Sequence, residues 1–378
     1  MFAPVRELVC RMGPAVWRLP PELRRRLVRE ARLGKLAGAR LYRFGAAEKI
    51  RPTRPARFWG RPTFGQRLAA RPHRLRQPFV VHLPGAWLVG RHAAPVTTAG
   101  RILLTSFRDQ PGLLGLEPQT DLLEWVRAAG WNQRRQPPDF RHLCSLVGRL
   151  DPNYFHWMIE SCGQIEGIEA YVQATGSRPR LLVRGGAGKF VRESLELLGW
   201  GNEVVEWPAE AQPAWVDGLV LASLPGNGAV SSPRSLRWLR DRFLAGAGAE
   251  PAGRRRLYIP RRPGGWRSVL NDDEVVARMR AEGFDIVSPE KLSLAEQIRL
   301  FSQASLIVAM HGAALTNLLF APRAAVLELT GSYGGGEYYS MASGLEMRYA
   351  SIRCQASGDN VVVDVPALVR TIEQFSHG

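Results

Sequence analysis

The fold class of this chain is best read from the stretch Leu306-Ile-Val-Ala-Met-His-Gly-Ala-Ala-Leu-Thr-Asn-Leu-Leu-Phe320. It begins with an apolar run typical of a buried strand, which ends at His311-Gly312 and leads into a short helical segment. A second apolar run, at 325–329, predicts the next strand. A strand, a glycine turn and a helix start point backbone N–H groups and the helix dipole at one place, which favours anion binding. The alternative is a tight turn that binds nothing, because such turns are common in α/β proteins.

The same alternation of strand-like and helix-like segments runs through most of the chain. Short apolar runs predict strands, and capping pairs such as Ser293 with Glu296 predict helix starts. The alternation therefore predicts an α/β fold with parallel, layered sheets. Predicted strands lie at 79–83, 86–89, 101–105, 142–147, 180–183, 203–207, 215–221, 256–260 and 284–287, and predicted helices at 153–173, 189–198 and 294–303, with a further helix opening at 271.

Composition divides the chain into three parts. Residues 1–75 are rich in arginine and proline and predict an irregular or helical N-terminal extension. Residues 76–248 and 249–378 predict two α/β domains, because the glycine- and alanine-rich stretch 245–253 is the best linker in the chain. Two such domains joined by a flexible linker would place a ligand in the cleft between them.

The net charge is +17, and it comes almost entirely from arginine. A basic balance is compatible with nucleic acid, an anionic membrane face or phosphorylated substrates, although solvated charge is the commoner explanation. The chain lacks aromatic–basic repeats and any recognisable reading motif, so no nucleic-acid partner is expected.

The cysteines and the hydropathy pattern bear on the compartment. Cys10, Cys144, Cys162 and Cys354 are scattered without metal spacing, and predict free thiols in a reducing compartment. No run approaches the roughly 20 apolar residues of a membrane span, and no signal-peptide pattern opens the chain. We therefore expect a bacterial-type cytoplasmic protein. The segment 21–39, where leucines alternate with arginines, predicts either an ordinary surface helix or peripheral contact with the inner face of the membrane.

A second polar cluster lies at 151–160, Asp-Pro-Asn-Tyr-Phe-His-Trp-Met-Ile-Glu. His156 and Glu160 are four apart, so they share one helix face, and Asn153 lies one turn before His156. A carboxylate beside an imidazole can serve as a general base. The alternative is a helix cap followed by an ordinary surface pair, which is frequent.

A third cluster follows the strand at 256–260. Arg261, Arg262 and Arg267 flank a Gly-Gly loop, an arrangement that suits bidentate phosphate recognition. Such arginines can neutralise the charge that develops on a departing diphosphate. A solvated loop would explain the same residues.

Two further features lie beyond the His-Gly turn. Glu328, inside the apolar strand 325–329, either faces solvent at a strand end or accepts hydrogen bonds from ligand hydroxyls such as those of a ribose. The run Gly334-Gly-Gly336 and the Glu337-Tyr-Tyr339 that follows predict a mobile loop, to which no role is assigned.

Together and in this order, the clusters resemble glycosyltransferase family 61. The resemblance covers roughly residues 140–330. The matching features are the Asn-x-x-His-Trp-x-x-Glu box at 153–160, the Tyr-Ile-x-Arg strand end at 258–261 with Arg267 and Asn271, Glu296-Gln297, the His-Gly-Ala-x-Leu-x-Asn-x-x-Phe box at 311–320 and Val-x-Glu-Leu at 326–329.

The resemblance implies a GT-B-like fold, in which two Rossmann-like domains face a central cleft and the second domain holds a nucleotide sugar. It implies an inverting, metal-independent glycosyltransferase that moves a sugar from a nucleoside-diphosphate sugar to a hydroxyl of a glycan or lipid-linked acceptor. Capsular or envelope polysaccharide biosynthesis is the expected setting. No metal and no cofactor other than the donor substrate are expected.

The resemblance also assigns the clusters to the two substrates, by position in this sequence. The residues implied to bind the nucleotide sugar are Arg261, or its neighbour Arg262, with Arg267, His311, Gly312, Asn317 and Glu328. The residues implied on the acceptor side are Asp151 and Asn153, and the residues implied to be catalytic are His156 and Glu160, which face the acceptor, with Glu160 expected to be the base. Eukaryotic relatives tend to carry aspartate at the position of Glu160.

Two other classes of protein compete with this interpretation. A non-catalytic protein could use the basic surface to hold an anionic polymer or nucleic acid, and steep salt dependence would reveal it. A dinucleotide-dependent oxidoreductase ranks last, because no Gly-x-Gly-x-x-Gly motif opens either domain.

Overall fold

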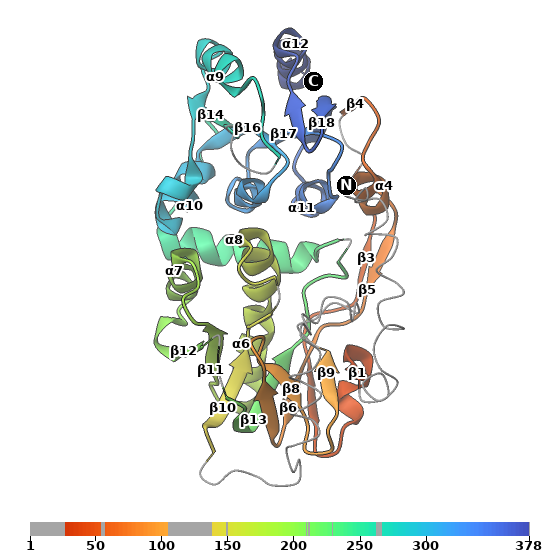
Figure 1. Cartoon of the computed structure of the whole chain (residues 1–378), viewed down its shortest axis with the longest axis vertical. Helices are drawn as coiled ribbons and strands as arrows, with labels where there is room; N and C mark the ends of the chain where they lie inside the picture. Colours follow the sequence, from red (N-terminus) through yellow and green to blue (C-terminus); the bar gives the residue numbers. More distant parts are fainter. Residues whose placement is uncertain are drawn as a thin grey trace.

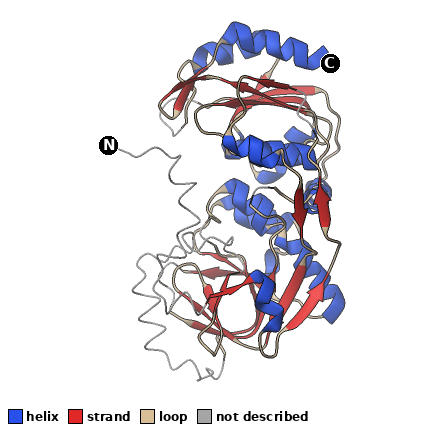
Figure 2. Ribbon diagram, turned by 90° about the vertical axis from the view of Figure 1, so that its right-hand side faces the viewer, coloured by secondary structure: helices blue, strands red, loops and turns tan. Residues whose placement is uncertain are grey.

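Two large β-sheets lie one above the other, with helices between them, in the computed structural model of the chain (Figure 1). Figure 2 shows the same arrangement from the side, with the C-terminal helix on the outer face of the upper sheet. The structure describes residues 27–53, 57–104, 138–148, 150–208, 210, 212–228, 230–261 and 267–377. The predicted α/β class with parallel sheets is confirmed.

The upper sheet is parallel throughout and contains the decisive stretch. Its strand order is β15-β14-β16-β17-β18-β4. The bounds are β4 (Arg57–Trp59), β14 (Arg255–Ile259), β15 (Asp285–Ile286), β16 (Ala304–Met310), β17 (Ala325–Thr330) and β18 (Tyr349–Arg353).

Helices cover both faces of this upper sheet. Because side chains alternate along a strand, Val308 packs into one apolar cluster with α9 and α12, whereas Ile307 packs into another with α10 and the 3-10 helix η6. Burial on both faces explains why β16 is apolar from Leu306 to Met310. The bounds are α9 (Asp272–Ala281), α10 (Leu294–Ser302), η6 (Ala313–Phe320), α11 (Glu337–Gly344) and α12 (Val365–His377), with η5 (Pro289–Lys291) and the hairpin β19 (Gln355–Ser357) and β20 (Asn360–Val362).

The lower sheet is mixed. Strands β10, β11, β12 and β13 pair in parallel, while β6 and β7 pair with β13 in the antiparallel sense. The order is β1-β9-β8-β7-β13-β10-β11-β12, with β6 joining β13 to β2. The bounds are β1 (Leu27–Arg29), β2 (Arg40–Arg43), β6 (Phe79–Leu83), β7 (Ala86–Val89), β8 (Ala94–Val96), β9 (Ile102–Leu104), β10 (Phe140–Ser145), β11 (Arg180–Arg184), β12 (Val204–Trp207) and β13 (Ala214–Ala222).

The helices of the lower half pack directly against those of the upper half. One apolar cluster contains Leu181 of the lower sheet, Phe243 of α8 and Ile307 of the upper sheet. The two halves therefore share a core, and α8 lies across the middle of the molecule (Figure 1). The predicted linker begins inside α8, which ends at Gly248 with a left-handed φ of 58°. The bounds are α6 (Gln164–Thr175), α7 (Lys189–Leu197), α8 (Pro233–Ala247), η1 (Glu30–Lys35) and η4 (Gly201–Glu203).

The segment before residue 75 contributes to both sheets, in contrast to the irregular or helical extension that its composition predicts. Strand β2 pairs with β6 in the lower sheet, and β4 pairs with β18 at the edge of the upper one. Between β4 and the next strand, α4 (Phe64–Ala69) packs on α11. The two-stranded antiparallel sheet of β3 (Glu48–Ile50) and β5 (His73–Leu75) runs between the two halves (Figure 1).

The cysteine and membrane predictions meet the structure only in part. Cys144, Cys162 and Cys354 are free and buried, while Cys10 and residues 21–26 of the basic segment lie outside the described residues. Among the described helices, none combines the length and the apolar character that a membrane span requires.

Candidate active site

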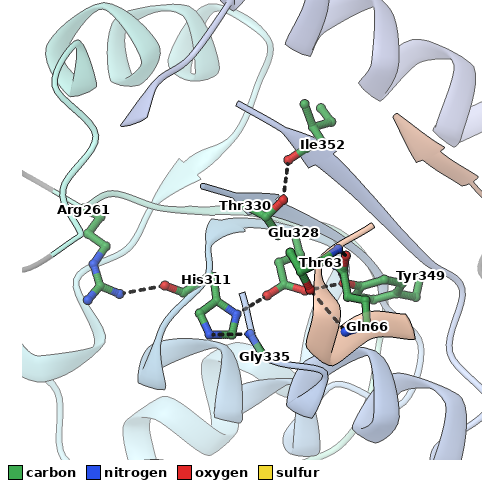
Figure 3. A network of polar contacts seen from close by, with 9 residues as sticks. All are labelled: Thr63, Gln66, Arg261, His311, Glu328, Thr330, Gly335, Tyr349 and Ile352. Atoms are coloured by element: carbon green, nitrogen blue, oxygen red, sulfur yellow. Dashed lines mark hydrogen bonds and ion pairs between the residues drawn. The ribbon is translucent and has the colours of Figure 1, made fainter. Parts of the chain in front are cut away.

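His311 lies at the end of β16, where its ring meets a carboxylate on the neighbouring strand. The backbone N–H of His311 donates to the carbonyl of Leu329 at 2.8 Å, which continues the β16–β17 ladder. Its Nδ1 lies 2.5 Å from Oε1 of Glu328, and the two side chains are 5% and 1% exposed. Both side chains are therefore buried, and Figure 3 shows the His311 ring facing the Glu328 carboxylate.

The second oxygen of Glu328 is also engaged. The hydroxyl of Tyr349, on β18, donates to Oε2 of Glu328. That hydroxyl in turn accepts a hydrogen bond from Nε2 of Gln66, on α4, at 2.8 Å. Protein groups therefore contact both oxygens of Glu328, and its predicted contact with a nucleoside stays a prediction.

Gly312 makes room for an arginine. Nη1 of Arg261 donates to the carbonyl of His311 at 3.1 Å. A Cβ atom on residue 312 would collide with this guanidinium. The φ of Gly312 is 169°, which any residue can adopt, so the close approach of Arg261 is what requires glycine here.

Arg261 and Arg267 form a basic pair beside His311. Burial, and then repulsion by Arg267, lowers the pKa of Arg261 below its ordinary value. The guanidinium of Arg267 lies 4.7 Å from the centre of the Tyr333 ring, and the centre of that ring lies 5.5 Å from that of the His311 ring. Two neighbouring cations at a strand–helix turn are stabilised by an anion, and a diphosphate fits this requirement. Arg262 lies outside the described residues.

Arg267 has an unusual backbone. Its φ is 63°, in the left-handed region, which costs a residue with a Cβ on the order of 1 kcal/mol or more. The next residues hold it there, because the N–H of Val269 donates to the carbonyl of Arg261 at 2.8 Å. This bond joins the backbone just beyond Arg267 to Arg261, at the end of β14.

The predicted general base lies on the lower half, in a π-helix, η3 (His156–Ser161). Nδ1 of His156 lies 2.9 Å from Oε2 of Glu160, and each side chain is 20% exposed. The predicted contact between these residues is therefore present. The single continuous helix predicted at 153–173 is instead a π-helix followed by α6, and π-turns are frequent at functional sites.

The two predicted acceptor-side residues hold the start of this helix. Oδ1 of Asn153 accepts from the N–H of Phe155 at 3.0 Å. Asp151 is buried, accepts from Nε of Arg184 at 2.9 Å and from the N–H of Gly148 at 3.1 Å. Burial outweighs these bonds and raises the pKa of Asp151. In this conformation both residues stabilise the chain locally.

The π-helix and the His311 turn meet. The ring of Phe155 lies 5.8 Å from that of Tyr338 on α11, which lies 5.2 Å from that of His311. The hydroxyl of Tyr154 donates to Oδ1 of Asn317 at 2.6 Å. Clusters that are far apart in the sequence are thus brought together between the two sheets.

Comparison with known proteins agrees with this arrangement. Residues 154–327 match the model of the family Glycosyltransferase 61. This chain carries a glycosyltransferase 61 domain. The domain contains Glu160, Arg261 and His311, and it ends one residue before Glu328.

One protein that is similar to this chain comes from a eukaryote. The chain is 35% identical over 96 residues to the EGF domain-specific O-linked N-acetylglucosamine transferase of Drosophila melanogaster. The matched part is 24% of this chain and 18% of that protein, so this chain covers less than a fifth of its relative.

Asn317 has a different environment from the one that the turn suggests. It is fully buried in the glycosyltransferase 61 domain, where its Nδ2 donates to Oε1 of Gln297 at 2.9 Å in addition to the bond from Tyr154. Its side chain therefore joins η6 to α10 and to the π-helix, and a contact with diphosphate stays a prediction.

A cavity of about 310 Å³ opens beside Glu160. It lies where the π-helix, the loop between β13 and α8, and the start of α11 meet, and Phe155, Glu160, Asn227, Ser231, Glu337 and Ser340 are among its lining residues. His156 holds the Glu160 carboxylate at the cavity wall by the bond described above. A polar cavity of this size can take a sugar hydroxyl to the carboxylate.

Several residues around the glycosyltransferase 61 domain site were missed by sequence reasoning. Tyr333, Tyr338 and Tyr349 surround the His311–Glu328 pair, and Gln66 reaches it from far upstream. The loop 334–336 is held by α4, because a Cβ on Gly336 would collide with the carbonyl of Gly65. The glycine run itself was the available signal, since close packing of two backbones requires residues without Cβ.

The site offers cations and not a cluster of metal ligands. Across the described residues, no group of three or more His, Cys, Asp or Glu side chains is placed to hold a metal ion. Arg261, Arg267 and His311 are the groups that suit a diphosphate. Whether the reaction uses a metal stays a prediction.

Proposed function

We propose that the protein is a glycosyltransferase that moves a sugar from a nucleoside-diphosphate sugar to a hydroxyl of a glycan acceptor. The observation that carries the proposal is the meeting of two unlike groups. The basic pair and His311 surround an anion-binding turn, and Glu160 faces a cavity on the adjoining half. The match to glycosyltransferase 61 and the similarity to the Drosophila melanogaster N-acetylglucosamine transferase support sugar transfer as the reaction.

The proposed mechanism is a single displacement. The Glu160 carboxylate accepts the proton of the acceptor hydroxyl while the hydroxyl oxygen attacks the anomeric carbon of the donor sugar. The bond from that carbon to the diphosphate breaks, and Arg261 and Arg267 neutralise the charge that the leaving group gains. Attack opposite the leaving group inverts the anomeric carbon. With cations from the protein in place, the proposed reaction proceeds without a metal.

The proposal also covers the roles of the two halves, the acceptor and the location of the protein. In a GT-B-like arrangement, the upper half would hold the donor and the lower half the acceptor. We propose that the acceptor is a glycan or lipid-linked glycan of a capsular or envelope polysaccharide. The net charge of +17 supports a location in the cytoplasm, beside an anionic membrane face.

The experiment is a binding and turnover comparison. Thermal-shift screening with UDP, GDP, CDP and ADP identifies the nucleotide, because a ligand that binds only the folded protein raises its melting temperature. Glu160→Gln should keep nucleotide binding and lose nucleotide release from the donor. Arg267→Ala should lose both.

Matched controls come from an exposed ion pair. Arg192 and Glu206 are 60% and 54% exposed and 3.3 Å apart. Arg192→Ala and Glu206→Gln should leave binding and turnover unchanged. Full activity in both site variants would overturn the assignment. Steeply salt-dependent binding of nucleic acid without any nucleotide binding would show the non-catalytic alternative instead.

A further inference from the structure

A chain of buried hydrogen bonds crosses the upper half and ends at the ring of His311 (Figure 3). It starts on α4, before the family-matched segment, and passes through two strands of the upper sheet. We call it the buried hydrogen-bond chain. Its members are Thr63, Gln66, Tyr349, Glu328, His311 and Gly335.

The first end of the buried hydrogen-bond chain fixes the direction of its protons. The backbone N–H of Thr63 can only donate, and it donates to Oε1 of Gln66 at 2.9 Å. The amide nitrogen of Gln66 therefore faces Tyr349 and donates to its hydroxyl. That hydroxyl must direct its own proton to Glu328. Burial, and then the charge of Glu328, raises the pKa of Tyr349, which keeps the phenol protonated.

The other end fixes the state of the imidazole. Oε2 of Glu328 accepts from Tyr349, and Oε1 faces Nδ1 of His311. The backbone N–H of Gly335 points at Nε2 from 3.4 Å. A backbone N–H only donates, so Nε2 presents a lone pair to it. Without a ligand, the ring is thus neutral and protonated at Nδ1.

That state cannot bond a diphosphate through Nε2. Phosphate oxygens accept hydrogen bonds at neutral pH, and a lone pair on Nε2 would repel them. A proton on Nε2 would reverse this, because Nε2 and the N–H of Gly335 could then both donate to the same anion. The carboxylate of Glu328, held behind the ring, would balance the charge of the imidazolium.

We propose that binding of a nucleoside diphosphate adds one proton to Nε2 of His311, and that Glu328 and Tyr349 are positioning residues that hold the ring and its counter-charge. The inference rests on the proposed function, since it assumes that the diphosphate occupies the turn beside Arg267. In this proposal Glu328 bonds the ring of His311 and does not contact the nucleoside.

The groups around the ring act in opposite directions on this proton. Arg261 and Arg267 oppose a further positive charge, whereas Glu328 on β17 and Glu337 on α11 favour it. The neighbouring phenols, Tyr333, Tyr338 and Tyr349, are kept neutral, because burial raises the pKa of each. The diphosphate reverses the local balance by neutralising the arginines.

The test uses the full chain and the nucleoside diphosphate from the screen, UDP first and GDP second. At pH 8 a free histidine is neutral and the diphosphate is fully ionised. Calorimetry in two buffers of different ionisation enthalpy should show about one proton taken up on binding. The affinity should fall about tenfold for each pH unit between 7 and 9.

His311→Gln supplies the comparison, because the titration of the nucleotide itself persists in it. This variant should bind without proton uptake and with a flat pH profile. His142→Gln is the control, since His142 lies in the lower sheet, bonded to Tyr171, and should behave as the wild type. Glu328→Gln removes the counter-charge and should lose proton uptake, whereas Tyr349→Phe, which keeps the carboxylate, should retain it.

The outcomes separate two kinds of failure. If UDP and GDP bind with no proton uptake, or if His311→Gln takes up the proton as well, the inference is overturned while the proposed function stands. If no nucleoside diphosphate binds at all, the proposed function fails and the inference falls with it. Should Glu328→Gln fail to fold, the wild type and His311→Gln still decide.

Discussion

Two imidazole–carboxylate pairs lie in the described part of the chain, and they differ in burial and in construction. His156 and Glu160 lie within one helix, 2.9 Å apart, and each is 20% exposed. His311 and Glu328 lie on neighbouring strands, 2.5 Å apart, and are 5% and 1% exposed. The first carboxylate lines a cavity, and the second is bonded on both oxygens inside the protein. The partly exposed pair therefore suits a proton acceptor, Glu160, whereas the buried pair suits a fixed support, Glu328, for the His311 ring.

The largest expected contrast is in stability. Glu328→Ala should lower the free energy of unfolding by about 3 kcal/mol or more, because it leaves Tyr349 and His311 buried without their acceptor. Glu160→Ala should lower it by less than about 1 kcal/mol, since the pair is partly exposed. Urea unfolding measures both. Equal losses would contradict the distinction between the pairs.

The next contrast concerns the turn beside the buried pair. Gly312→Ala should weaken nucleoside-diphosphate binding by roughly 10- to 100-fold, because the new Cβ displaces the guanidinium of Arg261. Calorimetry measures the change. Gly34→Ala, in η1 of the lower half, is the control and should bind normally. Unchanged binding by Gly312→Ala would show that Arg261 does not need its present position.

A smaller effect is expected from the start of the buried hydrogen-bond chain. Gln66→Leu should cost about 1–2 kcal/mol of stability, because the hydroxyl of Tyr349 and the N–H of Thr63 lose their partner. Gln164→Leu should cost a similar amount, since Gln164 is also buried and donates to the carbonyl of Ala222 at 2.8 Å. Only Gln66→Leu should also weaken nucleotide binding. Equal nucleotide affinity in the two variants would show that Gln66 on α4 does not influence nucleotide binding.

The smallest expected effect tests the strained arginine. Arg267→Gly should raise stability by about 0.5–1 kcal/mol, because glycine adopts the φ of 63° without strain, while nucleotide binding is lost with the guanidinium. Glu346 has a φ of 60° and provides the control. Glu346→Gly should gain similar stability in thermal unfolding and keep its binding. A loss of stability in Arg267→Gly would mean that the contacts of the guanidinium outweigh the strain.

Local patterns were sufficient for the parts of the site that are close in sequence. The spacing of His156 and Glu160 predicted their contact, and the apolar run before His311 predicted β16. The π-helix was not predicted, because a single inserted residue leaves the apolar pattern of an α-helix almost unchanged.

Long-range partners could not be predicted in this way. Asn317 reads as part of a ligand turn, but it is bonded to Tyr154, which is 163 residues away. The antiparallel strands of the lower sheet and the edge strand β4 are short, with weak alternation, and their pairing depends on segments distant in the chain. Gln66 reaches Tyr349 across 283 residues, a distance over which no periodicity carries information.

The placement of β4 and α4 in the upper sheet has a consequence for biosynthesis. When the ribosome has released residues 57–69, the strand that they pair with, β18, has not yet been translated. The nascent chain must keep this edge strand unpaired until residues 349–353 have emerged, and closing so long a loop is slow. A nascent chain stalled before Tyr349 therefore exposes an edge that invites aggregation or chaperone binding.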